Sequence, residues 1–220
     1  NIHVAIYDEE DTSPESYCAC PQFSNDIELT STLLSGAGYD VTLLSTTDIL
    51  NHELLTAKFD VFVLVNNVPR VSIYNYVYEY WLGGGGILSF NGGFGFLQYS
   101  GILSPDWAGV DEYLDEWMYL SDVFIYTYNY TVLNRHSTCK SYHPGDVIEA
   151  YINDTVIWNP AYIGLSNAAE FTPIAAPSAY AVVGCMLAID PINRAGGKAV
   201  QLAGNGSYIE PGLESIIIDS

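Results

Sequence analysis

Short apolar runs and amphipathic segments alternate through the first half of the chain. The pattern predicts strands at residues 2–7, 40–45, 60–65 and 87–90, and helices at 24–38, 47–57 and 72–82. Strands separated by helices of this length form parallel β-α-β crossovers. The run 61-VFVLV-65 is apolar throughout, which indicates a strand covered on both faces. We therefore predict an α/β, flavodoxin-like fold with a mostly parallel sheet sandwiched by helices.

A different pattern begins after Leu103. Residues 104–122 are acidic and aromatic, and residues 123–133 alternate Tyr with other side chains as a strand does. A β-hairpin that turns at Asn153-Asp154 is predicted within residues 147–159. Further strands are predicted at 179–189 and 197–204, and a last helix at 212–220. The simplest organisation is a single α/β domain over residues 1–220, with an added β-hairpin portion inserted at about residues 104–160.

The charge balance narrows the classes of partner. The chain has 220 residues, 49% of them hydrophobic, which suffices for one domain with a full core. Six Lys and Arg residues stand against 26 Asp and Glu residues, for a net charge of −20. Nucleic acid and anionic membranes need cations to neutralise their phosphates, so we expect neither as a partner. No apolar run approaches the roughly 20 residues of a membrane span.

Several features are typical of a secreted protein. The sequence begins at Asn1 instead of Met, which fits removal of a signal peptide or a shortened sequence. Three N-x-[ST] sequons, at Asn129, Asn153 and Asn205, are candidate glycosylation sites. We expect an extracellular or cell-surface location.

Four cysteines, Cys18, Cys20, Cys139 and Cys185, fit the same compartment. Outside the cell we expect two disulfides. A bond between Cys18 and Cys20 would be strained, so each is expected to reach Cys139 or Cys185. The alternative is a metal site, but a C-x-C pair with two isolated cysteines matches no common zinc ribbon.

The stretch 83-GGGGILSFNGGFGFLQ-98 has the pattern of a strand that enters a tight turn before a helix. A P-loop needs Lys and then Ser or Thr after its glycines, and Phe and Leu stand there instead. A dinucleotide fingerprint is half present at Gly93-Phe94-Gly95, but no acidic ribose ligand follows it. The third interpretation is a nucleophile elbow, in which a strained turn presents one side chain above the sheet.

Four segments carry a resemblance to a known family. They are 61-VFVLVNN-67, 83-GGGGILSFNGGFGFL-97, 134-NRHSTCKSYHPGDVIE-149 and 196-GGKAVQLAGNGSY-208. Together they resemble the class I glutamine amidotransferase-like superfamily, and within it the trehalose-utilisation-type branch. In family members the second segment has a glycine pair, a strand, Cys, a small residue, Gly and a helix. The resemblance covers most of the chain and implies an amidotransferase-like scaffold.

By this resemblance the nucleophile position falls on Asn91, which is followed by Gly92 and Gly93. Asparagine cannot accept an acyl group, because its amide nitrogen is not basic and has no thiolate-like state. The family's catalytic His lies in a His-Pro-Glu segment, whereas His143-Pro144 precedes Gly145. Both departures favour a protein without amidotransferase activity. A pocket around Asn91 that binds a small molecule without turnover is a further alternative.

Four consecutive carboxylates follow the first strand, at the sheet edge where α/β proteins bind ligands: Asp8, Glu9, Glu10 and Asp11. They offer oxygen ligands to Ca²⁺, but the EF-hand spacing is absent, which favours a solvated acidic loop. No other cofactor is expected. A second acidic cluster, 111-DEYLDE-116, has helical spacing that puts its acids on one solvated face. The histidines show neither H-x-H nor H-E-x-x-H spacing, so no metal site is expected among them.

Two classes of function follow. The first is a non-catalytic extracellular structural or interaction module, such as a subunit of a surface layer, filament or multi-domain surface protein, that self-associates or binds other surface proteins. The Tyr-rich stretch 124–132 is a candidate for edge pairing with another subunit. The second is a carbohydrate-binding or carbohydrate-active domain, which would use acidic and aromatic loops at the carboxyl edge of the sheet.

Overall fold

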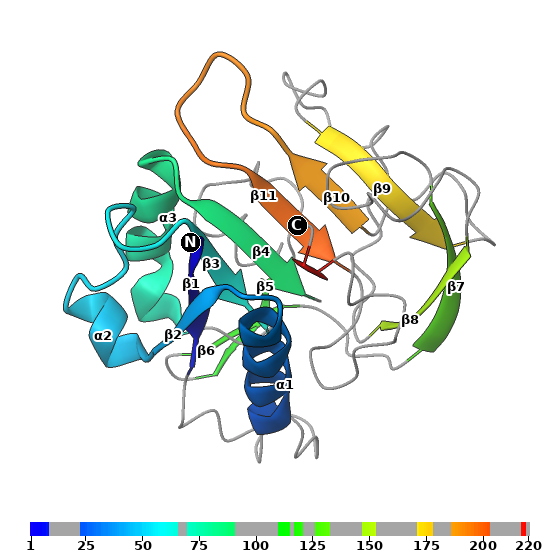
Figure 1. Cartoon of the computed structure of the whole chain (residues 1–220), viewed down its shortest axis with the longest axis horizontal. Helices are drawn as coiled ribbons and strands as arrows, with labels where there is room; N and C mark the ends of the chain where they lie inside the picture. Colours follow the sequence, from blue (N-terminus) through cyan, green and yellow to red (C-terminus); the bar gives the residue numbers. More distant parts are fainter. Residues whose placement is uncertain are drawn as a thin grey trace.

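Helices and strands alternate in the first half of the structure, and strands dominate the described part of the second (Figure 1). The computed structural model describes residues 1–8, 23–65, 70–90, 110–114, 117–120, 126–132, 147–152, 171–177, 186–202 and 217–218. The first half contains β1 (His3–Tyr7), α1 (Phe23–Gly36), β2 (Asp40–Leu44), α2 (Thr46–Leu50), β3 (Val61–Leu64), the short helix η2 (Val71–Ile73), α3 (Tyr74–Leu82) and β4 (Gly86–Phe90). The second half contributes β5 (Val110–Leu114), β6 (Trp117–Leu120), β7 (Tyr126–Val132), β8 (Val147–Ile152), β9 (Phe171–Pro177), β10 (Met186–Ile189) and β11 (Ala199–Leu202).

The main sheet has nine strands in the order β2-β1-β3-β4-β11-β10-β9-β7-β8, and β5 pairs with β6 separately. From β2 to β11 neighbouring strands are parallel. The strands from β10 onward pair antiparallel. The order at the parallel end, in which the chain reverses direction about β1, is that of flavodoxin-like sheets. The predicted α/β, flavodoxin-like fold is confirmed.

Helices cover both faces of the parallel part of the sheet. Because β2 and β3 lie on opposite sides of β1, right-handed crossovers place α1 on one face and α2 with α3 on the other. Val4 and Ile6 are buried on the α1 side, while Ala5 belongs to the core under α2 and α3. In β3, Phe62 and Val63 are both fully buried. This confirms that the apolar run 61-VFVLV-65 is covered on both faces.

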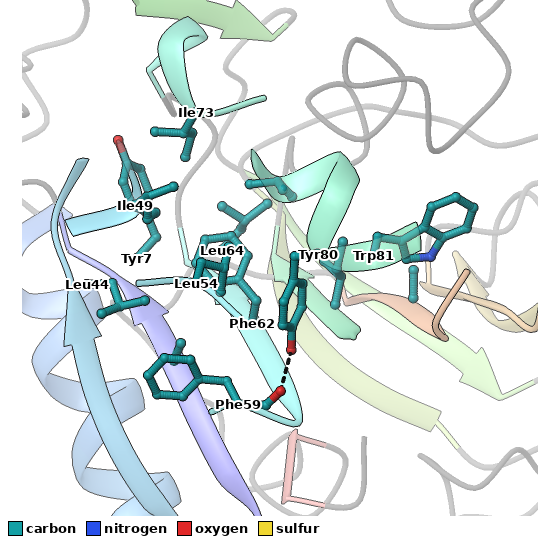
Figure 2. Close-up of a cluster of buried hydrophobic side chains, with 14 of the residues drawn as sticks. Tyr7, Leu44, Ile49, Leu54, Phe59, Phe62, Leu64, Ile73, Tyr80 and Trp81 are labelled. Carbon is teal, nitrogen blue, oxygen red and sulfur yellow. Dashed lines mark hydrogen bonds between the residues drawn. The ribbon is translucent and has the colours of Figure 1, made fainter. Parts of the chain in front are cut away.

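The core beneath α2 and α3 is rich in aromatic side chains (Figure 2). The rings of Phe62 and Tyr80 lie edge to face with centroids 6.3 Å apart. The Tyr80 hydroxyl donates a hydrogen bond of 3.2 Å to the carbonyl oxygen of Phe59. Burial raises the pKa of Tyr80, and the charge of Asp60 adds to the rise. The hydroxyl therefore stays protonated and ties α3 to the segment before β3.

The hairpin of β5 and β6 corrects one sequence prediction. The spacing of 111-DEYLDE-116 predicts acids along one face of a helix, but the segment forms antiparallel strands in which Leu114 pairs with Trp117. Only Asp115 and Glu116 connect the two strands. The β-favouring residues Val, Tyr and Trp in these strands outweigh a helical spacing that spans fewer than two turns.

The Tyr-rich strand β7 is an inner strand of the sheet. It pairs with β8 on one side and with β9 on the other, so the prediction that residues 124–132 form an open edge is wrong. The segment 147–152, predicted as the first arm of a hairpin, forms β8 and pairs with β7. The turn at Asn153-Asp154 and the second arm lie outside the described residues.

Two further elements differ from the prediction for local reasons. α2 ends at Leu50 instead of continuing to residue 57, because His52 has a left-handed φ of 62° that a helix cannot accommodate. β9 was not predicted from the sequence, since the proline residues within it argue against an inner strand. Pro173 pairs with Leu187, and the register shifts beside this pair, between Met186 and Leu187. A local irregularity of the ladder thus accommodates the proline.

Candidate functional site

The parallel strands end together at one edge of the sheet, the carboxyl edge. β4 ends there at Phe90, which pairs with Leu202 at the end of β11. Asn91 is the next residue in the sequence. The predicted elbow therefore follows a central strand at the edge where α/β proteins bind ligands. Asn91, Gly92 and Gly93 themselves lie outside the described residues.

Tyr7, the last residue of β1, contacts the connection after β2 and the connection after β3 at the carboxyl edge. Its ring is buried with 1% of its surface exposed, and its hydroxyl lies 2.7 Å from Thr46 Oγ1 at the start of α2. The backbone N–H of Arg70, in the connection after β3, donates to the same hydroxyl at 3.4 Å. One phenol thus links β1, β2 and β3 where the strand order reverses, the usual ligand-binding crevice of such sheets.

No sequence pattern considered above predicts this network. The available signal was a Tyr at the end of an otherwise aliphatic strand, 4-VAIY-7, since a buried phenol needs a hydrogen-bond partner. The partners, Thr46 and Arg70, come from two later connections, and no sequence pattern links them to Tyr7.

A capping box fixes the connection between β2 and α2. The Ser45 side chain accepts a hydrogen bond of 3.2 Å from the Asp48 N–H, and the Asp48 carboxylate accepts from the Ser45 hydroxyl at 2.6 Å and from the Ser45 N–H at 2.9 Å. The hydrogen bond from the Ser45 hydroxyl, and to a smaller extent the one from the Ser45 N–H, lowers the pKa of Asp48. The carboxylate therefore fixes the start of α2, the helix that begins at Thr46.

The acidic loop begins in the described part of the chain. Asp8 is half-buried, and its N–H donates to the Leu44 carbonyl at 2.8 Å, which extends the β1–β2 ladder by one bond. Glu9, Glu10 and Asp11 lie outside the described residues, so their role as cation ligands stays a prediction. Within the described residues, no group of three or more His, Cys, Asp and Glu side chains is placed to hold a metal ion.

Cationic side chains are unequally divided between the two edges of the sheet. Of the Lys and Arg residues that the structure describes, Arg70 alone follows a parallel strand at the carboxyl edge. Lys58 precedes β3, and Arg194 and Lys198 precede β11, all at the opposite, amino edge. The described part of the carboxyl edge has little positive charge and so does not favour polyphosphate ligands, which agrees with the lack of a P-loop motif in the sequence.

The glycines of 83-GGGG-86 lie at the amino edge, where they permit close packing. A Cβ atom on Gly85 would collide with the Tyr80 ring, and one on Gly197 would collide with the backbone of Gly85. Gly196 has a φ of +137° and lies against the Trp81 ring. Gly85, Gly196 and Gly197 therefore allow the segments before β4 and before β11 to pack closely, whereas Gly84 has open space beside it and supplies a φ of +96°.

Trp81 fastens these two glycine segments together. Its indole N–H donates to the Gly197 carbonyl at 2.7 Å, and the Gly197 N–H donates to the Trp81 carbonyl at 2.9 Å. The guanidinium carbon of Arg194 lies 5.1 Å from the centroid of the indole ring. The glycine-rich stretch thus begins in a packed amino edge and reaches the candidate site only after Phe90.

The remaining predicted site residues are scattered or undescribed. Asn129 lies in β7 and pairs with Glu149. The other sequons and all four cysteines lie outside the described residues: Asn153, Asn205, Cys18, Cys20, Cys139 and Cys185. His3 Nδ1 lies 3.3 Å from Asp40 Oδ2, and the His52 ring packs edge-on against Tyr76. In the part of the chain that is described, no helix is long and apolar enough to cross a membrane.

Comparison with known proteins identifies the class of scaffold. No protein-family model matches the chain, and no curated protein sequence matches it. The glutaminase domain of Trypanosoma brucei CTPS has a TM-score of 0.62 at 10% identity, over 99% of this chain and 91% of that one. A ThuA-like protein from Bacteroides uniformis has a TM-score of 0.56 at 14% identity, over 99% and 89%. A β-galactosidase from Bacillus circulans has a TM-score of 0.54 at 11% identity, over 99% of this chain and 30% of that one.

These similarities define the fold. The chain shares its fold with ThuA-like proteins and with a CTPS glutaminase domain. The fold that the sequence resemblance implies is confirmed. At sequence identities of 14% and below, these structural similarities show a shared fold and do not show a shared activity.

Proposed function

We propose that the chain is a non-catalytic interaction or structural module on an amidotransferase-like scaffold, acting outside the cell or on its surface. The observation that carries the proposal is the sequence at the end of β4, where Asn91 follows Phe90. A covalent mechanism needs a side chain there that attacks a carbonyl carbon and later leaves it. The amide of Asn91 does neither, so the scaffold has lost the chemistry of its elbow.

Composition supports the interaction role. Sequons, cysteines and a net charge of −20 fit an extracellular protein that is kept soluble by its charge. The match to the Bacillus circulans β-galactosidase covers only 30% of that chain, so scaffolds of this fold also occur as parts of longer proteins. Self-association or binding to other surface proteins is the activity that we assign to this module.

A turnover comparison tests the proposal. Wild-type protein and the Asn91→Ala variant are assayed for ammonia release from glutamine and for hydrolysis of amides, esters and glycosides. We expect both proteins to match the buffer blank. Turnover by the wild type that Asn91→Ala abolishes, with the folded structure retained, would overturn the proposal.

Carbohydrate binding is the second candidate, and the position of Asp8 favours it. This carboxylate follows β1 directly at the carboxyl edge and opens the acidic loop. A glycan array with wild-type protein, Asp8→Ala and the exposed control Glu79→Ala tests it. Binding that is lost only in Asp8→Ala supports a sugar site at this edge, and no binding by the wild type argues against it.

A further inference from the structure

β2 is the outermost strand on one side of the main sheet. Its one neighbour in the sheet is β1, and within the described residues no strand lies on its other side (Figure 1). Asp40, Thr42 and Leu43 are exposed, and Leu43 keeps 44% of its surface accessible. An exposed strand edge of this kind is a template for pairing with another strand.

The backbone N–H and C=O groups of β2 point alternately toward β1 and away from it. The Asp40 N–H donates to the Ile2 carbonyl at 3.0 Å, and the Leu44 carbonyl accepts from Asp8 at 2.8 Å. In a parallel pair the N–H and C=O of one residue point to the same neighbour, and successive residues alternate. Asp40, Thr42 and Leu44 therefore bond to β1. The N–H and C=O groups of Val41 and Leu43 point outward.

We propose that β2 pairs antiparallel with β2 of a second copy of this chain, about a two-fold axis at Thr42. This register pairs all five residues of the strand, because Thr42 is its central residue. Val41 then lies opposite Leu43 of the second copy, so outward-pointing backbone groups meet outward-pointing groups. A register shifted by one residue would bring outward groups against inward ones, so these bonds could not form.

Side-chain chemistry agrees with the two-fold register. Asp40 lies opposite Leu44 of the second copy, so no carboxylates of the two strands face each other directly. The exposed Leu43 meets Val41, and Thr42 meets its own symmetry mate. Apolar and Thr–Thr cross-strand pairs are favourable, whereas opposed like charges are not. The single charge of the strand thus stands at its end, where self-pairing tolerates it.

The two helices beside β2 bear on how two copies approach. α1 and α2 both contact β2, and Figure 1 shows the strand passing between them. Each helix carries an exposed leucine, Leu29 in α1 and Leu50 in α2. No Lys or Arg occurs in residues 23–50, so two approaching copies repel at long range. Since salt screens that repulsion, dimerisation should strengthen as ionic strength rises.

A five-residue strand with a few flanking side chains makes a small interface. Interfaces at the small end of the size range give weak, concentration-dependent complexes. We therefore expect a dimer in equilibrium with monomer. This inference names the surface for the proposed interaction role and rests on that role for its biological meaning.

Charged residues introduced at the two-fold axis provide the test. Thr42→Asp sets two carboxylates against each other in a homodimer, and Thr42→Lys sets two ammonium groups against each other. Sedimentation velocity over a concentration series should show each variant dimerising at least about tenfold more weakly than wild type. An equimolar mixture should recover dimers of at least wild-type strength. Thr56→Asp, an exposed threonine before β3, is the control and should behave as wild type.

The outcomes separate the proposals. A wild type that stays monomeric at high protein and salt concentration overturns β2 pairing, as does a dimer that both Thr42 variants leave intact or that the mixture fails to restore. If a Thr42 variant does not fold, Leu43→Asp removes the apolar pair at an exposed position and should weaken the dimer. Glutamine turnover that depends on Asn91 would overturn the non-catalytic role and leave the dimer result standing.

Discussion

The two edges of the parallel sheet are built differently. At the amino edge, Trp81 exchanges two buried hydrogen bonds with Gly197, and glycine backbones touch without side chains between them. At the carboxyl edge, the Tyr7 hydroxyl holds Thr46 at 2.7 Å and the Arg70 N–H at 3.4 Å. The stretch 83-GGGGILSFNGG-93 runs from the first edge to the second.

This difference teaches that one glycine-rich pattern can have two physical roles. Among its first four glycines, Gly85 serves packing, because a side chain there would collide with Tyr80, and Gly84 serves a turn with a φ of +96°. Its last glycines follow Asn91, at the end where the fold presents functional groups. Glycine density alone therefore does not mark a ligand site, and the end of the strand on which the glycines stand decides their role.

The largest expected effect is at the amino edge. Gly197→Ala places a methyl group against the Gly85 backbone, which has no flexible end to move aside. We expect a loss of about 3 kcal/mol in the free energy of unfolding, measured by chemical denaturation. Gly36→Ala is the control: nothing lies near its Cβ position, and its stability should stay within about 1 kcal/mol of wild type. Equal effects of the two variants would contradict glycine-to-glycine packing.

Trp81→Phe tests the hydrogen bond within the same edge. The phenyl ring retains most of the apolar contact but leaves the buried Gly197 carbonyl without its indole donor at 2.7 Å. We expect a loss of about 2 kcal/mol by denaturation. Arg194→Ala, which removes the exposed cation over the ring, should cost about 0.5 to 1 kcal/mol. The reverse order would mean that the cation and not the hydrogen bond joins the two segments.

Tyr7→Phe makes the corresponding change at the carboxyl edge. It removes the hydroxyl shared by Thr46 and the Arg70 N–H while the buried ring remains. Thr46 is half-buried and can turn to water, so we expect a loss of about 1 kcal/mol, less than for Trp81→Phe. A cost larger than that of Trp81→Phe would make the carboxyl edge the more tightly held of the two.

The smallest expected effect concerns the capping box at the carboxyl edge. Asp48→Asn should cost about 0.5 to 1 kcal/mol near neutral pH, since the charged acceptor for Ser45 is lost. Because hydrogen bonds from Ser45 lower the pKa of Asp48 in the folded protein, its contribution is present above the unfolded pKa of about 3.9. It disappears as the pH falls through the folded pKa. Denaturation of both proteins as a function of pH should therefore show the curves converging in acid, and a constant difference would contradict the capping role.

Most of the parallel sheet was predictable from sequence because its strands are buried on both faces. The runs around Ile6 and Val63 are continuously apolar, and both strands lie near the predicted positions. The position of Asn91 after a central strand followed from the same pattern. Where a segment is short or carries prolines, as at Pro173 in β9, local propensity gave no usable signal and tertiary pairing decided the structure.

The contacts that distinguish the two edges were not predictable. Gly85 meets Gly197, and Tyr7 meets Thr46, through contacts between residues far apart in the chain. Composition and periodicity report local structure and burial, not which distant residues meet. The turn at His52 is a related case, because its left-handed conformation ends α2 without a glycine to announce it.

The most direct measurement of the difference between the edges is native-state hydrogen exchange. We expect the amino edge to hold the scaffold while the carboxyl edge opens more easily. The Trp81 indole N–H and the Gly197 N–H should exchange only with a free energy close to that of global unfolding. The Arg70 N–H, bonded to Tyr7 at 3.4 Å, should exchange through local opening at a clearly lower free energy. An Arg70 amide protected as strongly as Gly197 would contradict the claim.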